Sequence, residues 1–245
     1  GVLRAPGTAD LLEAALNEGA DVLGGLDPIT IDNDLDGQLD TLFAIAERCS
    51  TGIDIHLHDA GPDGLTEINA LCSRTNASGL SGRVTVSHGF CLGAASADEF
   101  ARTADAMAAA GVSLATHGGA SSPLPPVKAL RERGVEVFAG NDNVRDTWSP
   151  FGNGDMLERA MLLAWRSGYR TDDDLKIALD CASGAGARVL GLQGHGLAVG
   201  DHADLFTVDA ETLGEAVAQR PRRGIVLKGG SVVAREGKFT GDAGA

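Results

Sequence analysis

The stretch IDIHLHD, residues 53–59, decides the fold class of this chain. It begins with alternating β-branched and polar side chains, a pattern that predicts a strand. His56, His58 and Asp59 lie at the carboxyl end of that strand, and the AGPDG that follows at residues 60–64 predicts a turn. Polar groups at the carboxyl end of a strand are typical of α/β proteins, which build their sites at that edge of a parallel sheet.

Strands and helices alternate on both sides of this stretch. Each expected strand is apolar enough to be buried on both faces, and each crossover contains a helix, which favours parallel pairing. The other expected strands are residues 20–26, 83–88, 112–116 and 135–139, and the expected helices are residues 8–17, 37–49, 65–75, 97–110 and 126–133.

The character of the sequence changes after the last of these strands. A long loop at residues 140–155 precedes expected helices at residues 156–167 and 172–182 and a short one at 187–190. Short apolar runs then flank glycine-containing turns, which predicts small antiparallel strands at residues 203–208, 224–227 and 231–234. We therefore expect an α/β domain over residues 1–191 and a second segment over residues 192–245.

Composition limits the class of protein. The 245 residues are 43% hydrophobic and 22% charged, which is typical of a globular protein with a sizeable core. A net charge of −14 repels nucleic acid and anionic lipid, so neither is an expected partner. The four cysteines form no CxxC pair, and there is neither a signal peptide nor an apolar run long enough for a membrane span, so we expect a cytoplasmic address.

Polar groups follow four successive expected strands. A single histidine at a strand end is usually a hydrogen-bonded structural residue, and a single aspartate can cap a loop. Together, however, neutral imidazoles and a carboxylate are the ligand types that Zn²⁺ and Fe²⁺ prefer. The groups are His56, His58 and Asp59, then His88, then His117, and then Asn141, Asp142 and Asn143.

These motifs resemble those of the cytosine deaminase branch of the metal-dependent amidohydrolase superfamily. The matching segments are HLHDAG at residues 56–61, VSH at 86–88 and AGNDNVRDTWSPFGNGDMLERAM at 139–161, of which residues 142–156 are the most specific. The segments at residues 196–210 and 224–238 resemble the small β-sandwich that closes such chains. The similarity extends from Gly1 to about residue 237.

The resemblance implies a TIM-type (β/α)8 amidohydrolase barrel that holds one divalent metal, Zn²⁺ or Fe²⁺. By this resemblance His56 is the metal ligand on the fifth strand, and Asp142 is the ligand on the eighth. Residues 20–26 would then be strand four, so the first three strands, their HxH metal pair and a substrate-binding glutamine are missing. We expect the metal to be weakly held unless that HxH is supplied, by a companion N-terminal segment or within a homo-oligomer.

The resemblance also implies roles for other residues. His88 contacts the attacking water or the substrate, and Asp142 takes the water's proton. Where the family has a glutamate that carries protons, this chain has Asp59, which is one methylene shorter, and His58 is the alternative carrier. Trp148 resembles the aromatic residue that lines the substrate pocket in this family. His117 and Asn143 are also expected to face the substrate, but from their positions in the sequence and not from a family role.

Two functions remain open at the level of the sequence. The favoured one is hydrolysis of a C–N bond, a deamination, in a small cyclic amidine or amide such as a cytosine-like pyrimidine. The alternative is a catalytically incomplete or degenerate barrel fragment with a structural or assembly role, because barrels host many functions. An HxH strand upstream of Gly1 would favour the enzyme.

Overall fold

The computed structural model describes residues 1–119 and 122–240. The chain divides into two compact units, Gly1–Phe138 and Ala139–Ala245, which are considered separately. Within the described residues, no helix is both long and apolar enough to cross a membrane.

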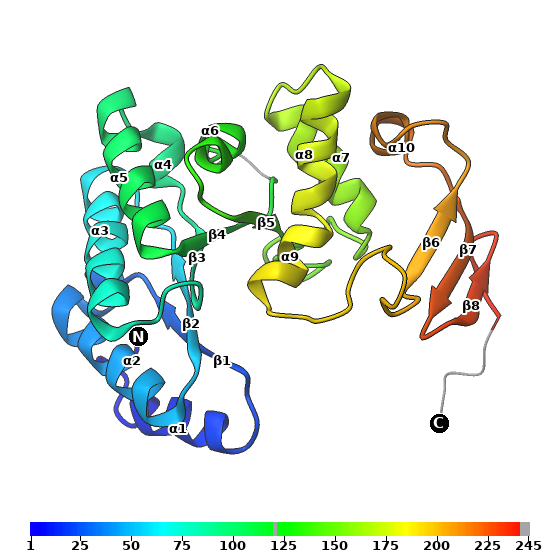
Figure 1. Ribbon diagram of the computed structural model, residues 1–245. Helices are drawn as coiled ribbons and strands as arrows, with labels where there is room; N and C mark the ends of the chain where they lie inside the picture. The colour runs from blue at the N-terminus through cyan, green and yellow to red at the C-terminus, as the bar shows by residue number, and fades with distance from the viewer. Residues whose placement is uncertain (120–121, 241–245) are drawn as a thin grey trace. The chain divides into compact units, whose positions relative to one another are not determined.

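A parallel sheet forms the centre of the first unit (Figure 1). Its strand order follows the sequence, and β1 with β2, β2 with β3, and β3 with β4 all pair in parallel. The predicted α/β class and parallel sheet are therefore confirmed. The strands are β1 (Val22–Leu26), β2 (Gly52–Leu57), β3 (Val84–His88), β4 (Val112–Thr116) and β5 (Val137–Ala139).

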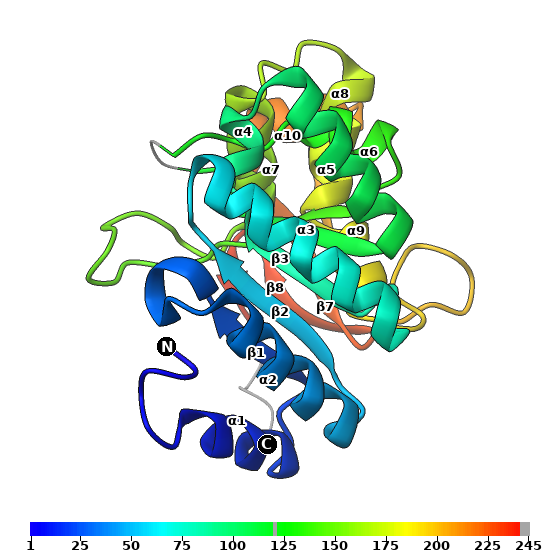
Figure 2. The same ribbon diagram turned by 90° about the vertical axis from the view of Figure 1, so that its left-hand side faces the viewer.

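Helices cover one face of this sheet. Figure 2 shows α2, α3 and α5 in front of the strands, and the side chains fully buried in this unit include Leu23, Ile53, Ile55, Leu71 and Leu114. The helices are α1 (Thr8–Asn17), α2 (Leu35–Cys49), α3 (Gly61–Ser78), α4 (Cys91–Ala94), α5 (Ala97–Ala110) and α6 (Val127–Glu132), with a π-helix, η1, at Pro28–Asp32.

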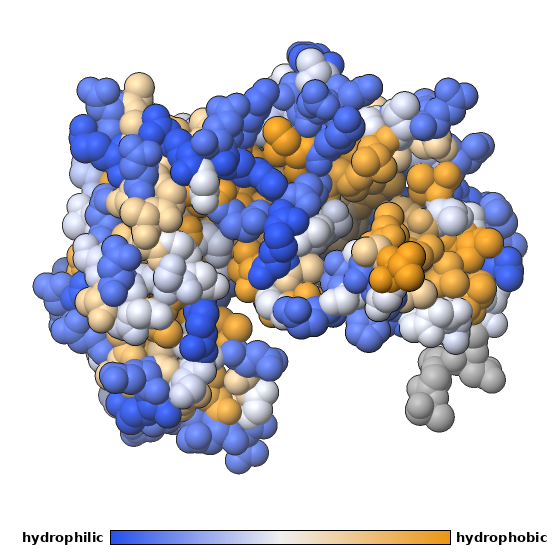
Figure 3. Space-filling model, in the orientation of Figure 1, coloured by the Kyte–Doolittle hydropathy of each residue, from blue (hydrophilic) through white to orange (hydrophobic). Residues whose placement is uncertain are grey.

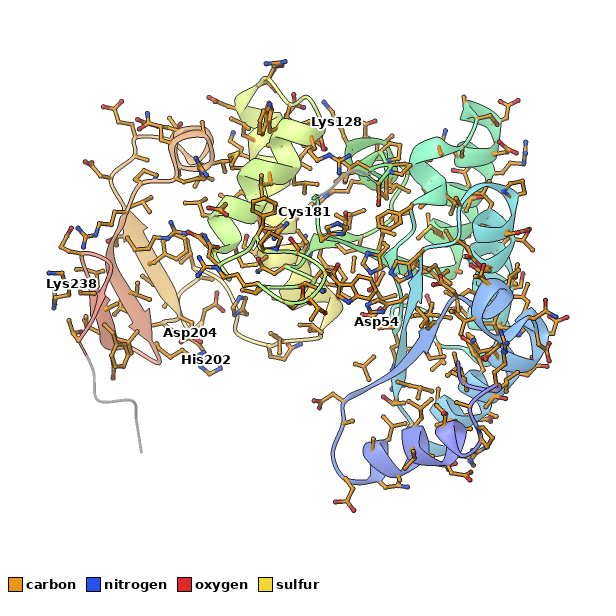
Figure 4. All side chains as sticks on the ribbon, turned by 180° about the vertical axis from the view of Figure 1, so that it is seen from behind. Asp54, Lys128, Cys181, His202, Asp204 and Lys238 are labelled. Carbon is orange, nitrogen blue, oxygen red and sulfur yellow. The ribbon has the colours of Figure 1, made fainter. Side chains whose placement is uncertain are left out.

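The opposite face of the sheet is more polar than predicted. Burial alternates along β2, so Ile53, Ile55 and Leu57 are buried while the intervening residues are not, and the expectation that each strand is buried on both faces is wrong for β2. Asp54, which Figure 4 labels on β2, accepts a hydrogen bond of 2.7 Å from the Ser87 hydroxyl of β3. Polar groups on this face therefore bond across the strands.

Two segments that follow strands are helical, and one of them replaces the predicted turn at residues 60–64. Helix α3 begins at Gly61 and has Pro62 in its first turn, where the missing N–H of proline costs no hydrogen bond. The loop after β1 forms η1, which has Pro28 in its first turn. Both segments begin close to the carboxyl ends of their strands, so local proline chemistry shapes that edge of the sheet.

The first residues of the chain are fixed by one buried carboxylate. Asp32 accepts backbone N–H groups from Val2, Leu3 and Arg4 at 2.9–3.1 Å and the Gln38 amide at 2.6 Å. Burial raises the pKa of Asp32, but these hydrogen bonds outweigh it and the pKa is lowered. Gln38 also donates to the carbonyl of Leu26, which links the segment to the end of β1.

The second unit contains helices and a separate antiparallel sheet. Strands β6–β9 pair in sequence order, which confirms the predicted antiparallel strands. Figure 3 shows hydrophobic residues gathered over this sheet. The exposed apolar side chains of the unit include Leu197, Val199, Phe206 and Phe239. Its elements are α7 (Met156–Arg166), α8 (Asp172–Cys181), α9 (Gly184–Val189), β6 (Leu205–Val208), α10 (Leu213–Gln219), β7 (Arg223–Lys228), β8 (Ser231–Arg235) and β9 (Lys238–Phe239).

Candidate active site

Histidines from three neighbouring strands converge at one edge of the parallel sheet. His56 lies near the end of β2, His88 ends β3, and His117 directly follows β4. The His88 ring centroid is 4.9 Å from that of His56, 4.3 Å from that of His58 and 5.5 Å from that of His117. The structure therefore brings these four predicted positions together, with His88 at the centre.

His88 has an unusual backbone. Its φ is 73°, a left-handed conformation that costs a non-glycine residue about 1–2 kcal/mol, and its side chain is only 6% exposed. Gly89 follows with φ of 57°. Such conformations persist where the surrounding structure fixes them, and they cluster at functional sites. The backbone turns at the end of β3, and His88 is held at the centre of the histidine group.

His58 is paired with a carboxylate from the neighbouring strand end. Asp27, the first residue after β1, accepts the His58 backbone N–H at 2.5 Å and contacts the His58 Nδ1 at 2.8 Å. Asp27 is 7% exposed. A buried carboxylate against Nδ1 fixes the ring orientation. His58 is therefore an oriented imidazole rather than a solvent-facing loop residue.

Asp59 faces the η1 turn. Its carboxylate accepts the Thr30 hydroxyl at 2.5 Å and the Thr30 backbone N–H at 3.2 Å. One carboxylate oxygen of Asp59 also lies within 4.8 Å of one from Asp27 and one from Glu67, forming an acidic cluster of three side chains. Asp59 thus lies next to the histidine group and is bonded at the same time to the loop after β1.

Asp54 lies on the same strand as His56, two residues before it. Burial raises the pKa of Asp54, and the hydrogen bond from Ser87 and the neighbouring His56 oppose that rise. Thr85 and Ser113 continue the polar face with a hydroxyl–hydroxyl hydrogen bond of 2.8 Å. These groups form a bonded polar layer on β2, β3 and β4.

The remaining predicted site residues lie in the second unit, on the loop between β5 and α7. Asp142 has φ of 61°, another left-handed non-glycine conformation, and its charge interacts favourably with Arg159 of α7. Burial lowers the pKa of Arg159, and the carboxylates of Glu158 and Asp142 oppose this.

Hydrogen bonds around Asp146 order the same loop. The Asn143 amide donates to the Asp146 carboxylate, which also accepts the Trp148 backbone N–H at 2.9 Å and the Ser149 backbone N–H at 3.1 Å. The Trp148 side chain is 86% exposed. Asn143 and Trp148 therefore flank one carboxylate of this loop.

The first unit offers nitrogen ligands that suit a divalent metal. Ring nitrogens of His56 and His88 lie within 4.8 Å of each other at the strand ends. Imidazole nitrogen is a preferred ligand type for Zn²⁺ and Fe²⁺. The donor chemistry of these residues fits the metal that the resemblance implies.

Sequence reasoning missed two carboxylates of this site. Asp27 directly follows β1, and that position was a usable signal. Glu67 was hidden within the predicted helix at residues 65–75, where one polar residue looks like part of a solvated face. The structure places Glu67 at 1% exposure, facing Asp27 and Asp59.

The model of the Amidohydrolase family matches residues 1–234 of this chain. N-isopropylammelide isopropyl amidohydrolase from Pseudomonas sp. (strain ADP) is 34% identical over 227 residues, covering 92% of this chain and 56% of that protein. Pterin deaminase from Rhizobium rhizogenes is 28% identical over 244 residues, covering 91% of this chain and 54% of that protein. The chain thus spans about half the length of the curated relatives that it matches.

Solved structures agree with these sequence relationships. N-isopropylammelide isopropylaminohydrolase from Burkholderia multivorans has a TM-score of 0.95 and 48% identity, over 98% of this chain and 62% of that one. The 5-methylcytosine deaminase from Klebsiella pneumoniae, liganded with phosphonocytosine, has a TM-score of 0.86 and 25% identity, over 96% of this chain and 61% of that one. This chain therefore belongs to the amidohydrolase family, as a cytosine deaminase-like member of the metal-dependent superfamily.

Proposed function

We propose that this chain is part of an enzyme that hydrolyses a C–N bond and releases an amino group from a small nitrogen heterocycle, such as a cytosine-like pyrimidine. The main support is the convergence of four imidazoles at the carboxyl ends of β2, β3 and β4. The names of the relatives, which include a 5-methylcytosine deaminase, a pterin deaminase and an N-isopropylammelide isopropylaminohydrolase, point to the same class of bond.

We infer that β1–β5 correspond to strands four to eight of a (β/α)8 barrel, and that the first three strands lie outside the sequence given. Five strands that alternate with helices in sequence order support this, as does the greater length of the relatives. We further propose that residues 1–191 form the barrel part and residues 192–245 a β-sandwich segment. The antiparallel sheet β6–β9 supports the second assignment.

The proposed metal ligands of this chain are His56 and Asp142, with an HxH pair supplied from outside it. The support is the imidazole chemistry at the end of β2 and the position of Asp142 just after β5. A bound Zn²⁺ or Fe²⁺ would supply a Lewis acid that lowers the pKa of water toward about 7.

Different side chains are proposed to carry out the separate steps of the reaction. In this proposal Asp142 accepts a proton from the attacking water, Asp59 transfers protons to the ring and to the leaving nitrogen, and His88 donates a hydrogen bond to the developing oxyanion. The position of Asp59 three residues after His56 supports its role. The buried, conformationally fixed His88 suits a donor whose position must not change during the reaction.

His58 is the alternative proton carrier. Its ring lies 4.3 Å from that of His88 and is oriented by Asp27, whereas the Asp59 carboxylate is bonded to Thr30. We propose substrate contacts for His117, which lies beside His88, and for Asn143 and Trp148 on the ordered loop of the second unit.

Two substitutions in the complete protein show whether Asp59 or His58 is the main proton carrier. Asp59→Asn should lower kcat at least about a hundredfold on cytosine, 5-methylcytosine or N-isopropylammelide, because the amide transfers no proton, while metal content is unchanged. His58→Ala should reduce the rate less. If His58→Ala causes the larger loss of kcat, the roles of Asp59 and His58 are reversed. Wild-type protein that holds metal but turns over none of these heterocycles would contradict the proposed function itself.

A further inference from the structure

Glu67 of α3 is a buried carboxyl group that the proposed reaction does not use. It is 1% exposed, and one of its oxygens lies within 4.8 Å of carboxylate oxygens of both Asp59 and Asp27. Three carboxylates this close repel one another strongly if all are ionised, and most strongly where burial removes water. One of them needs a proton or a bound cation.

The hydrogen-bond donors show where that proton belongs. Asp59 accepts two bonds from Thr30, and Asp27 accepts two from His58. Glu67 Oε1 accepts the Ile29 backbone N–H at 2.9 Å. Glu67 Oε2, in contrast, is buried and has no hydrogen-bond donor among the described residues. An ionised oxygen without a donor is costly when buried, whereas a protonated one becomes a donor itself.

The surrounding charges agree with a protonated Glu67. The pKa of Glu67 is raised to about 8, mainly by burial and also by the Asp59 and Asp27 carboxylates, while the Ile29 N–H opposes the rise. From α4 the group is faced by Cys91, whose thiol is itself neutral because burial raises its pKa to about 12.

Among the described residues, the charged groups that act on Glu67 are carboxylates, and no cation from the packed helices is one of them. Arg74, on the same helix as Glu67, is bonded to Asp36 and Asp40 of α2. The contact between α3 and α5 includes the uncharged pair Asn69 and Thr103. A proton is therefore the neutralising group that the described residues provide.

We propose that Glu67 is a positioning residue that stays protonated and donates a hydrogen bond to Asp59, so that the two carboxyl groups share one proton and the Asp59 carboxylate is fixed in place. Asp59 would then be held from two sides, by Thr30 in the loop after β1 and by Glu67 in α3. This inference rests on the proposed function, in which Asp59 transfers protons. Asp59 is shorter than the glutamate of the family pattern, so its position depends more on such support.

Kinetics of two variants in the complete protein test the positioning role. Glu67→Gln keeps an acceptor for Ile29 and a donor for Asp59, so kcat at pH 7 should stay within about threefold, and the loss of activity that ionisation of Glu67 causes near pH 8 should disappear. Glu67→Leu removes the donor, so kcat should fall at least about tenfold with KM nearly unchanged. An unchanged kcat in Glu67→Leu would overturn the positioning role.

A readout independent of activity tests the shared proton. Because the folded-state pKa of Glu67 lies above its unfolded value, this group stabilises the fold fully below about pH 4.5, and the stabilisation is lost as pH rises to about 8. The melting temperature should therefore fall more steeply between pH 5 and 8 in wild type than in Glu67→Gln. Equal slopes of melting temperature against pH in the two proteins would overturn the shared proton. A rise in melting temperature on addition of Ca²⁺ that Glu67→Gln abolishes would overturn it as well.

Failure of the Glu67 positioning role can be distinguished from failure of the proposed function. If the melting slopes differ as expected but Glu67→Leu is fully active, the proton pair exists and its positioning role is wrong. Whether Asp59 itself transfers protons is then decided separately by the rate of Asp59→Asn, which does not depend on Glu67.

Discussion

At the scale of single residues, the pairing of His58 with Asp27 has a measurable consequence. Both oxygens of Asp27 accept a donor from His58, one from the backbone and one from the ring. An asparagine in place of Asp27 offers only one acceptor, and its amide group would face a second N–H. The pair therefore depends on a carboxylate at this position and not merely on a polar side chain.

We predict that Asp27→Asn destabilises the fold by about 1–3 kcal/mol, because a partly buried donor loses its acceptor. Activity should fall by roughly tenfold, less than for Asp59→Asn, since the His58 ring loses its orientation but the main carrier remains. Urea unfolding and steady-state rates measure the two effects. Asp21→Asn, at an exposed position of the same unit, is the matched control and should change neither.

At the scale of elements, the start of α3 controls the position of Asp59. A Cβ added at Gly64, in the first turn of this helix, would lie 2.1 Å from the backbone oxygen of Asp59 and 2.9 Å from the Cβ of Cys91. Neither atom can move without shifting a backbone. Helix α3 and the loop that contains Asp59 are thus in direct contact through a residue with no side chain.

Gly64→Ala should therefore displace Asp59 and lower kcat by about tenfold to a hundredfold, because a shift near 1 Å is enough for such losses. Steady-state kinetics of the complete protein measure it. Gly24→Ala in β1 is the control, since an added Cβ there meets nothing within 4 Å. A fully active Gly64→Ala protein would contradict the assignment of Asp59 as proton carrier or the tight contact.

The elements also show how far sequence reasoning reached. The alternation at residues 53–57 and the helical spacing between strands predicted β2 and its neighbours correctly, because hydrophobic periodicity is a local property. Helix α3 begins four residues earlier than predicted, because Gly61 and Pro62 were read as turn residues and not as a proline-containing first turn.

The candidate site was only partly visible in the sequence. The sequence predicted His56, His88 and His117 because each lies near the carboxyl end of a strand or directly follows it. Glu67 was not found, because its role depends on packing between α3 and two loops that lie far away in the sequence. Such long-range carboxylate contacts leave no periodic signal.

At the scale of the whole molecule, the five-stranded sheet has two outer strands. Its strand order places β1 and β5 at the outer positions among the described residues, whereas a closed barrel has no free edge. We propose that a companion N-terminal segment or a second copy pairs with these strands. The same partner would supply the HxH pair.

The 245-residue chain alone should then bind Zn²⁺ weakly and show no measurable deaminase activity, because catalytic zinc normally has three protein ligands and only His56 and Asp142 are proposed here. Extension upstream through an HxH strand should restore both. Metal analysis after dialysis and turnover of cytosine measure this. Stoichiometric metal and turnover by the 245-residue chain would show that it is not an incomplete part of the active unit.

The Asp32 carboxylate has a mechanical consequence. It binds three successive backbone N–H groups at residues 2–4, and through Gln38 it is connected to the carbonyl of Leu26 at the end of β1. Tension applied at Val2–Arg4 would therefore load the carboxyl end of β1, next to Asp27 and the histidine group, and bypass α1. These five hydrogen bonds connect the start of the chain directly to the edge of the candidate active site and would transmit force between them.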